Sequence, residues 1–100
     1  MIAFHPDALA EVEAARDWYE EKRSGLGAAL VDEVGHALVR IEEAPLSFAR
    51  DPAGRAARRA WLGRFPYSLV FTVLDDHRIL IVAMAHAKRR QGYWRRRERD

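Results

Sequence analysis

YSLVFTVLDDHRILIVAMAH, residues 67–86, is the stretch of sequence that decides the fold. Two runs of apolar, β-branched and aromatic residues, 67–74 and 78–86, flank the polar triplet Asp75-Asp76-His77. Such runs on either side of a short polar turn are typical of paired β-strands. Because both runs are almost entirely apolar, we expect both faces of this strand pair to be covered.

Two amphipathic helices are predicted before this strand pair, over residues 6–23 and 26–43. Apolar residues recur there at three- and four-residue spacing, which is the period of one helix face. Ser24-Gly25 ends the first helix, and the short connection predicts an antiparallel helical hairpin. The apolar stripes consist of Ala8, Val12, Ala15 and Tyr19 in the first helix and Leu30, Val34, Ala37, Leu38 and Ile41 in the second.

The remaining segments complete a small α+β domain that we expect to span residues 1–100. Residues 1–5 predict a short edge strand, residues 45–57 a loop, and residues 58–65 a weaker strand. The helical hairpin is expected to pack on one face of a mainly antiparallel sheet, followed by a short basic C-terminal tail. Gly35, inside the second helix, is expected to let the two helices approach closely.

Composition excludes several classes of protein. The chain has no cysteine, and its four histidines fall on different predicted elements, so we expect neither a disulfide nor a metal site. No glycine-rich phosphate-binding loop occurs, and no cofactor is expected. No apolar run approaches the roughly 20 residues of a membrane span, and the first residues lack the pattern of a signal peptide. We therefore expect a cytoplasmic protein.

Charge is distributed unevenly along the chain. Residues 1–44 contain ten acidic and four basic residues, whereas residues 86–100 contain seven basic and two acidic residues. This asymmetry fits a basic face for an anionic partner, although a solvated surface of mixed charge explains it equally well. The basic end follows directly on the second apolar run, and it includes two aromatic residues, Tyr93 and Trp94.

Several motifs in a fixed order resemble the RelE/ParE superfamily of toxins. They are A-x-x-WYE at 15–20, GLG at 25–27, FPY at 65–67 and A-x-A-H-x-x-R-x-x-x-YW-x-x-R at 83–97. The resemblance implies a helical hairpin on a small twisted sheet. It also implies the toxin half of a bacterial type II toxin–antitoxin system. A cognate antitoxin with a flexible acidic C-terminal segment would cover the second face of the sheet, and operator DNA would be bound only through the antitoxin.

The superfamily offers two mechanisms. RelE-like members cut mRNA in the ribosomal A site without a metal, and ParE-like members act on DNA gyrase. The RelE-like nuclease carries an arginine six residues before its C-terminal tyrosine, and the matching position here is Ala87. The ParE-like action is therefore favoured. A ribosome-dependent endoribonuclease is the alternative, and a non-toxic remnant that only binds its antitoxin is the third hypothesis.

The resemblance also predicts the residues of the site. In a nuclease, His86 would be the base, Arg89 and Arg59 would hold the phosphate, and Tyr93 would stack on a base or act as an acid. The predicted target-binding residues are His86, Lys88, Arg89, Arg90, Tyr93, Trp94 and Arg97, and the predicted antitoxin contacts are Tyr67, Leu69 and Phe71.

Simpler interpretations compete with these roles. His86 would then be a strand-end histidine bonded to a neighbouring backbone group, and residues 95–97 a solubilising tail. Trp18 and Tyr19 are expected to pack in the core or within the helical hairpin.

Overall fold

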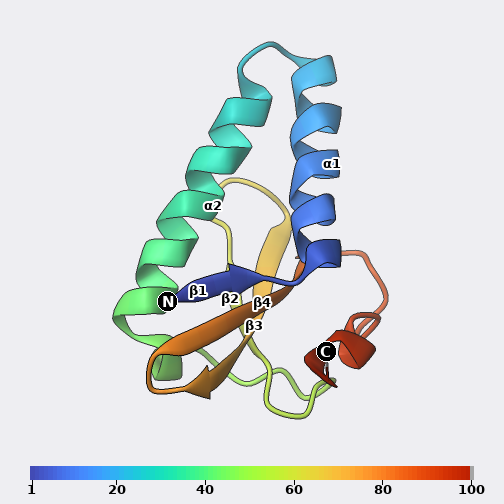
Figure 1. Cartoon of the computed structure of the whole chain (residues 1–100). Coiled ribbons are helices and arrows are strands. Elements are labelled where there is room, and N and C mark those ends of the chain that lie inside the picture. Colours follow the sequence, from blue (N-terminus) through green and yellow to red (C-terminus); the bar gives the residue numbers. More distant parts are fainter. Residues whose placement is uncertain (100) are drawn as a thin grey trace.

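The computed structural model describes residues 1–99 and has a layer of two helices on one side of a β-sheet (Figure 1). The predicted α+β class, with a helical hairpin on a mainly antiparallel sheet, is confirmed. Two short 3-10 helices, η1 and η2, complete the chain. The elements follow in the order β1 (Ile2–Phe4), α1 (Pro6–Lys22), α2 (Leu26–Glu43), η1 (Pro45–Ser47), β2 (Arg58–Trp61), β3 (Tyr67–Asp75), β4 (Arg78–His86) and η2 (Arg95–Arg99).

The sheet has the strand order β1-β4-β3-β2. β3 and β4 form the predicted antiparallel pair, β2 adds to β3 antiparallel, and β1 adds to β4 in parallel. Val70 pairs with Ala83. The next residue, Phe71, pairs with Ile81, which leaves Val82 as an extra residue in β4. Such a β-bulge bends the strand and shifts the faces to which its later side chains point.

The helical hairpin buries its apolar stripe on one face of this sheet, as the arrangement in Figure 1 shows. Burial of apolar surface, worth about 25 cal/mol per Å², is the main force that holds the two layers together. Tyr19 and Leu38 lie at the margin of the stripe and are only partly buried. The residues of this layer that are wholly buried are Ala8, Leu30, Ala37, Ile41, Leu69, Phe71 and Ile81.

Polar side chains fix the ends of the helices. His5 precedes α1, and its Nδ1 accepts a hydrogen bond from the backbone N–H of Asp7 at 3.1 Å. At the other end of α1, the carboxylate of Glu20 accepts hydrogen bonds from the backbone N–H groups of Gly25 and Gly27. These contacts satisfy donors that a helix start leaves without an intrahelical partner. Glu20 thereby fixes the start of α2 against the end of α1.

The helices approach each other closely at Gly27, and not at Gly35 as the sequence predicts. A Cβ atom at Gly27 would lie 2.8 Å from the backbone oxygen of Arg16, whereas a Cβ atom at Gly35 would meet nothing within 4 Å. The expectation for Gly35 is therefore wrong. Because no neighbouring backbone approaches Gly35, its only effect is the lower helix propensity of glycine.

The sheet face that points away from the helices is covered in part by the chain itself. The C-terminal segment and the loop before β2 lie below the sheet in Figure 1. Trp94 is wholly buried there beside Val70 and Val82. This part of the face needs no antitoxin to cover it, which corrects the expectation drawn from the resemblance.

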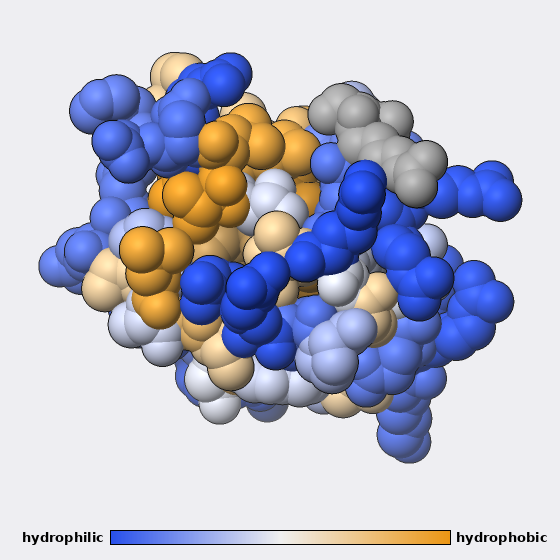
Figure 2. Space-filling model, turned by 90° about the horizontal axis from the view of Figure 1, so that it is seen from below, coloured by the Kyte–Doolittle hydropathy of each residue, from blue (hydrophilic) through white to orange (hydrophobic). Residues whose placement is uncertain are grey.

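The view from below the sheet shows a hydrophobic patch beside a hydrophilic area (Figure 2). The exposed large hydrophobic residues include two leucines, Leu46 in η1 and Leu74 near the end of β3. Leu46 is 69% exposed and Leu74 is 49% exposed, so a large part of each side chain contacts solvent.

Two local predictions differ from the structure. The strand predicted over residues 58–65 is shorter, because the Leu62 N–H donates to the backbone oxygen of Tyr67 at 2.9 Å and closes the connection to β3. Trp18 is 55% exposed and not packed in a core. Its ring lies edge-on to Tyr19 on the same helix, with 4.9 Å between the ring centroids.

The two glycines of α2 are expected to respond oppositely to alanine. Gly35→Ala should raise the free energy of unfolding by about 0.5–1 kcal/mol, because alanine favours the helix and restricts the unfolded chain. Gly27→Ala should lower it, because the new Cβ would collide with a backbone oxygen at 2.8 Å. Urea denaturation measures both values. Equal destabilisation by the two substitutions would contradict the assignment of Gly27 as the contact point.

Candidate functional site

The basic turn, residues 88–90, begins where β4 ends. The Lys88 N–H donates to His86 Nδ1 at 3.0 Å, and the Arg89 N–H donates to the His86 backbone oxygen at 2.9 Å. These hydrogen bonds fix the backbone of the turn against the strand end. All three cationic side chains are exposed, and within residues 1–99 none of them forms an ion pair with a carboxylate.

His86 and Arg89 are both held by aromatic rings. His86 is half-buried, and its ring lies edge-on to Tyr67 with 5.0 Å between the centroids. Since Nδ1 accepts a hydrogen bond, the neutral ring carries its hydrogen on Nε2. The guanidinium carbon of Arg89 lies 3.9 Å from the centroid of the Tyr93 ring. The interpretation of His86 as a strand-end histidine bonded to a backbone group matches this geometry.

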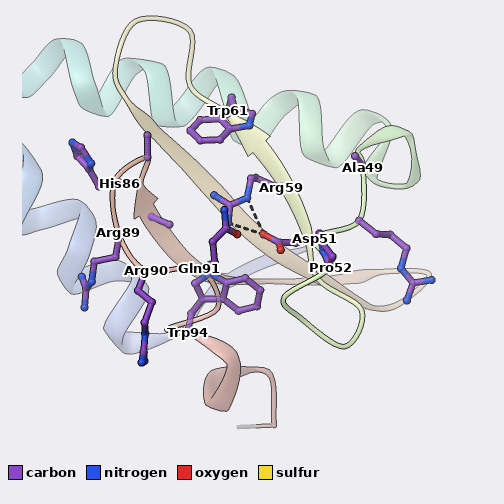
Figure 3. Close-up of a pocket in the computed structure, with 13 residues that line it drawn as sticks. Ala49, Asp51, Pro52, Arg59, Trp61, His86, Arg89, Arg90, Gln91 and Trp94 are labelled. Carbon is purple, nitrogen blue, oxygen red and sulfur yellow. Dashed lines mark hydrogen bonds and ion pairs between the residues drawn. The ribbon is translucent and has the colours of Figure 1, made fainter.

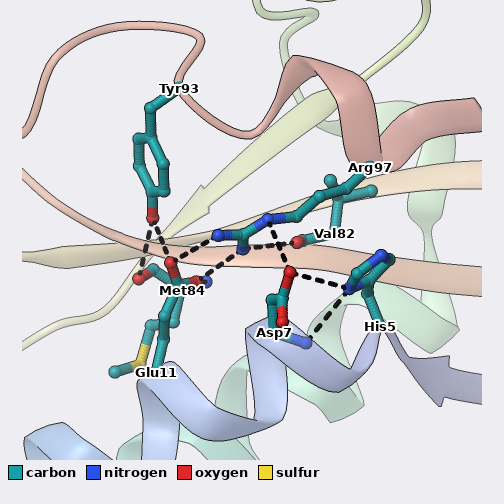
Figure 4. A network of polar contacts seen from close by, with 7 residues as sticks. All are labelled: His5, Asp7, Glu11, Val82, Met84, Tyr93 and Arg97. Atoms are coloured by element: carbon teal, nitrogen blue, oxygen red, sulfur yellow. Dashed lines mark hydrogen bonds and ion pairs between the residues drawn. The ribbon is translucent and has the colours of Figure 1, made fainter.

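Glu11 of α1 is the centre of a polar network that ties the C-terminal segment to β4 (Figure 4). Its carboxylate accepts hydrogen bonds from the Tyr93 hydroxyl at 2.8 Å and from the Met84 backbone N–H at 3.0 Å. Arg97 contacts both carboxylate oxygens at 3.0 Å and donates to the backbone oxygen of Val82 at 3.1 Å. Because β1 is only three residues long, this part of the β4 edge lies beyond it, and side chains satisfy its backbone groups.

The network shifts the pKa values of two of its members. Burial, followed by the hydrogen bond to Glu11, raises the pKa of the Tyr93 hydroxyl well above its ordinary value. Burial alone would lower the pKa of Arg97, but the hydrogen bond and the charge of Glu11 outweigh it, so the pKa of Arg97 is raised. Tyr93 is therefore a neutral hydrogen-bond donor, and Arg97 is a charged partner of Glu11. Both side chains are engaged within the chain.

Trp94 belongs to the core beneath the sheet. Its side chain is wholly buried and packs with Val70, Val82 and Ala85. A Cβ atom at Gly54 would lie 2.8 Å from the indole ring, so the loop before β2 can close over the ring only with glycine at this position. Trp94 has no accessible surface, which corrects the prediction that it contacts a target.

Arg59 lies at a pocket of about 370 Å³ on this same side of the sheet (Figure 3). It donates two hydrogen bonds to Asp51 Oδ2, at 2.9 and 2.6 Å, and a third to Ser68 Oγ at 2.6 Å. The Asp51 carboxylate is only 2% exposed, so this is a buried ion pair. Because Asp51 neutralises Arg59, this guanidinium is not free to hold a phosphate as the nuclease hypothesis requires.

The structure separates the residues that the sequence groups together. The pocket brings Arg59, His86 and Arg89 near one another, but Tyr93 does not line it. The four nuclease candidates therefore do not form one free constellation. Of the predicted target-binding residues, Lys88, Arg89 and Arg90 are exposed, His86 is half-buried, and Tyr93, Trp94 and Arg97 hold the C-terminal segment in place.

The predicted antitoxin contacts differ in accessibility. Leu69 and Phe71 are wholly buried beneath the helices, where a partner could reach them only if the helices moved away. Tyr67 is partly exposed. Contact with an antitoxin therefore stays a prediction for Tyr67. Leu69 and Phe71 have no accessible surface that an antitoxin could contact.

Sequence reasoning missed Glu11, Asp51 and Trp61. A signal for Glu11 is present, since it lies three residues after Ala8 and four before Ala15, on the apolar stripe of its helix. An acidic residue on such a stripe needs a partner. Asp51 and Trp61 carry no comparable signal, because one lies in a loop and the other in a weakly predicted strand.

The described part of the chain contains neither a candidate metal-binding cluster nor a candidate membrane-spanning helix. Within residues 1–99 no group of three or more His, Asp or Glu side chains is placed to hold a metal ion. Neither α-helix combines the length and the apolar character that crossing a membrane requires.

The fold defines a class of small α+β proteins in which a helical hairpin covers one face of a mixed four-stranded sheet. Residues 2–91 match the family described as the ParE toxin of the type II toxin-antitoxin system, parDE, and the chain belongs to this family. A solved structure described as the chromosomal ParDE TA system from P. aeruginosa has a TM-score of 0.74. The match covers 87% of this chain and 95% of that chain at 19% identity, so it shows a shared fold. No curated protein matches the chain.

Glu11→Ala is expected to lower the free energy of unfolding by about 2 kcal/mol. It leaves the Met84 N–H without its partner and leaves Arg97 with only the more distant carboxylate of Asp7, at 3.9 Å. The matched control is Glu13→Ala, an exposed acid on the same helix, which should change stability by less than about 0.5 kcal/mol. Chemical denaturation monitored by circular dichroism gives both values. Equal effects would show that Glu11 has no anchoring role.

The raised pKa of Tyr93 predicts a loss of stability in alkaline solution. The folded state favours the neutral hydroxyl, so its contribution is complete below the ordinary tyrosine pKa of about 10 and is lost as the pH rises through the folded pKa. Tyr93→Phe should flatten this decline. Burial also raises the pKa of Tyr67, so part of the decline should remain in the variant. Melting temperatures at increasing pH measure the effect, and an unchanged slope in Tyr93→Phe would refute it.

Proposed function

We propose that this protein inhibits bacterial growth by acting on DNA gyrase, and that a cognate antitoxin neutralises it in the cytoplasm. The basic turn at residues 88–90 carries the proposal. Its three exposed cations have no carboxylate partner within residues 1–99 and are fixed at the end of a buried strand. Such a patch suits an anionic surface, such as that of an enzyme that holds DNA.

The choice of gyrase over the ribosome is supported by family membership and by the state of the candidate catalytic residues. The chain belongs to the ParE toxin family. The resemblance described above implies that ParE-like members of the superfamily act on gyrase. Two of the four nuclease candidates are engaged elsewhere, Arg59 by Asp51 and Tyr93 by Glu11. The arginine that the RelE-like nuclease carries is replaced by Ala87.

The antitoxin would be a small protein with a flexible acidic C-terminal segment, which suits the basic end of this chain. The similar solved structure is described as a ParDE TA system, which supports a partner of this kind. Tyr67 is the predicted contact that such a segment could reach without moving the helices. Operator DNA would be bound only through the antitoxin.

Tightly induced expression in a bacterial host tests the proposal. Thymidine incorporation should fall before methionine incorporation, because gyrase inhibition stops DNA synthesis first. In vitro, the purified protein should inhibit DNA supercoiling by gyrase. The double substitution Lys88→Glu and Arg90→Glu should weaken this inhibition by at least about 10-fold, since like charges at an interface oppose binding.

The matched control is the double substitution Lys22→Glu and Arg23→Glu. It makes the same change in net charge at two exposed residues beside the loop between α1 and α2. This control should keep full activity. An earlier fall of protein synthesis would assign the ribosome as the target, and the absence of any growth defect would favour the antitoxin-binding remnant.

A further inference from the structure

The pocket of Figure 3 lies beside the basic turn and has features that the proposed function does not use. β2 supplies one wall through Arg59 and Trp61, and the end of β4 supplies Ala85 and His86. The segment after β4 supplies the opposite side, including Gln91 and the edge of the buried Trp94. Residues from two distant parts of the chain, 49–61 and 85–94, therefore converge on one cavity of about 370 Å³.

Trp61 is the unusual member of this pocket. Its side chain is 50% exposed, although burying an indole ring is strongly favourable. The guanidinium of Arg59 lies 5.4 Å from the ring centroid and is itself held by Asp51 and Ser68. The backbone oxygen of Trp61 accepts a hydrogen bond from Arg40 at 3.1 Å. The ring is thus supported by a rigid neighbour and still open to solvent.

The charge of the pocket favours an anionic ligand. Four arginines and one aspartate line it, and the aspartate is neutralised by Arg59. Arg89 and Arg90 lie on the rim and point outward in Figure 3, whereas Gln91 lies centrally between Arg59 and Trp94. The pocket therefore offers cations at its rim and the amide of the exposed Gln91 between Arg59 and Trp94.

We propose that this pocket binds single-stranded nucleic acid. One base would stack on the open surface of Trp61, the Gln91 amide would meet the polar edge of the base, and Arg89 and Arg90 would contact the flanking phosphates. Base stacking on an exposed aromatic ring beside cations is the usual chemistry of single-strand binding. An acidic peptide would use the rim arginines but would leave the ring of Trp61 without a planar partner.

Fluorescence anisotropy with a short fluorescein-labelled oligothymidylate tests this assignment directly, and the assay contains no gyrase. The wild-type protein should bind the strand, and hybridising the strand to oligoadenylate should weaken binding because the bases are then stacked inside a duplex. Trp61→Ala should reduce the affinity by roughly 5- to 150-fold. Trp61→Phe, which keeps a ring, should retain most of the affinity.

Trp18→Ala is the matched control, because Trp18 is similarly exposed, at 55%, and also lies beside a cation, Lys22. It should bind the strand like the wild type. Thermal unfolding of each variant excludes loss of the fold as the cause of lost binding. Equal loss in Trp18→Ala and Trp61→Ala, or no binding by the wild type, would overturn the proposal. Binding of polyglutamate in a Trp61-dependent manner, without binding of the oligothymidylate, would assign the pocket to an acidic protein segment.

Discussion

The carboxylate of Glu11 joins three parts of the chain: the first helix, the β4 strand and the C-terminal segment. A partly buried carboxylate, 18% exposed here, is stable only when hydrogen-bond donors replace the water that it has lost. Here a strand amide, a tyrosine hydroxyl and a guanidinium fill that role. The first helix, the free edge of β4 and the C-terminal segment consequently form one unit. The burial of Trp94 beneath the sheet depends on this attachment, since the same segment carries both residues that reach Glu11.

This attachment also determines which cations face solvent. Arg97 is drawn inward by Glu11, with Asp7 at 3.9 Å as a second carboxylate, and Arg59 is drawn inward by Asp51. The basic turn lies between these two ion pairs along the chain and has no such partner in the described residues. Arg89 is further steadied by the ring of Tyr93, whose hydroxyl Glu11 holds. The hydrogen bonds of Glu11 therefore hold in place the tyrosine ring against which the exposed Arg89 packs.

The parts of the fold that local periodicity controls could be predicted from sequence, and the parts that distant contacts control could not. Both helices and the β3-β4 pair repeat an apolar pattern within a few residues, so their positions are readable. The end of the chain reads as a charged tail because arginines surround Tyr93 and Trp94. Its folding back depends on a partner 82 residues away in sequence. In the same way, the helices approach closely at Gly27 and not at the predicted Gly35, because that contact depends on the backbone of the neighbouring helix.

Because β4 contains an extra residue at Val82, the number of residues in this strand decides which side chains face the helices. Before Val82, the odd-numbered residues Ile79 and Ile81 face the helices. After Val82, the even-numbered Met84 faces them. The small Ala83 and Ala85 therefore lie under the indole ring, and the larger Met84 faces the helices. Deleting one residue here would move Met84 to the face of Trp94 and turn Ala83 and Ala85 toward the helices, although the rest of the strand sequence would be unchanged. Selection on this segment must act on spacing as strongly as on hydrophobicity, so insertions and deletions should be rarer in β4 than substitutions of one apolar residue by another.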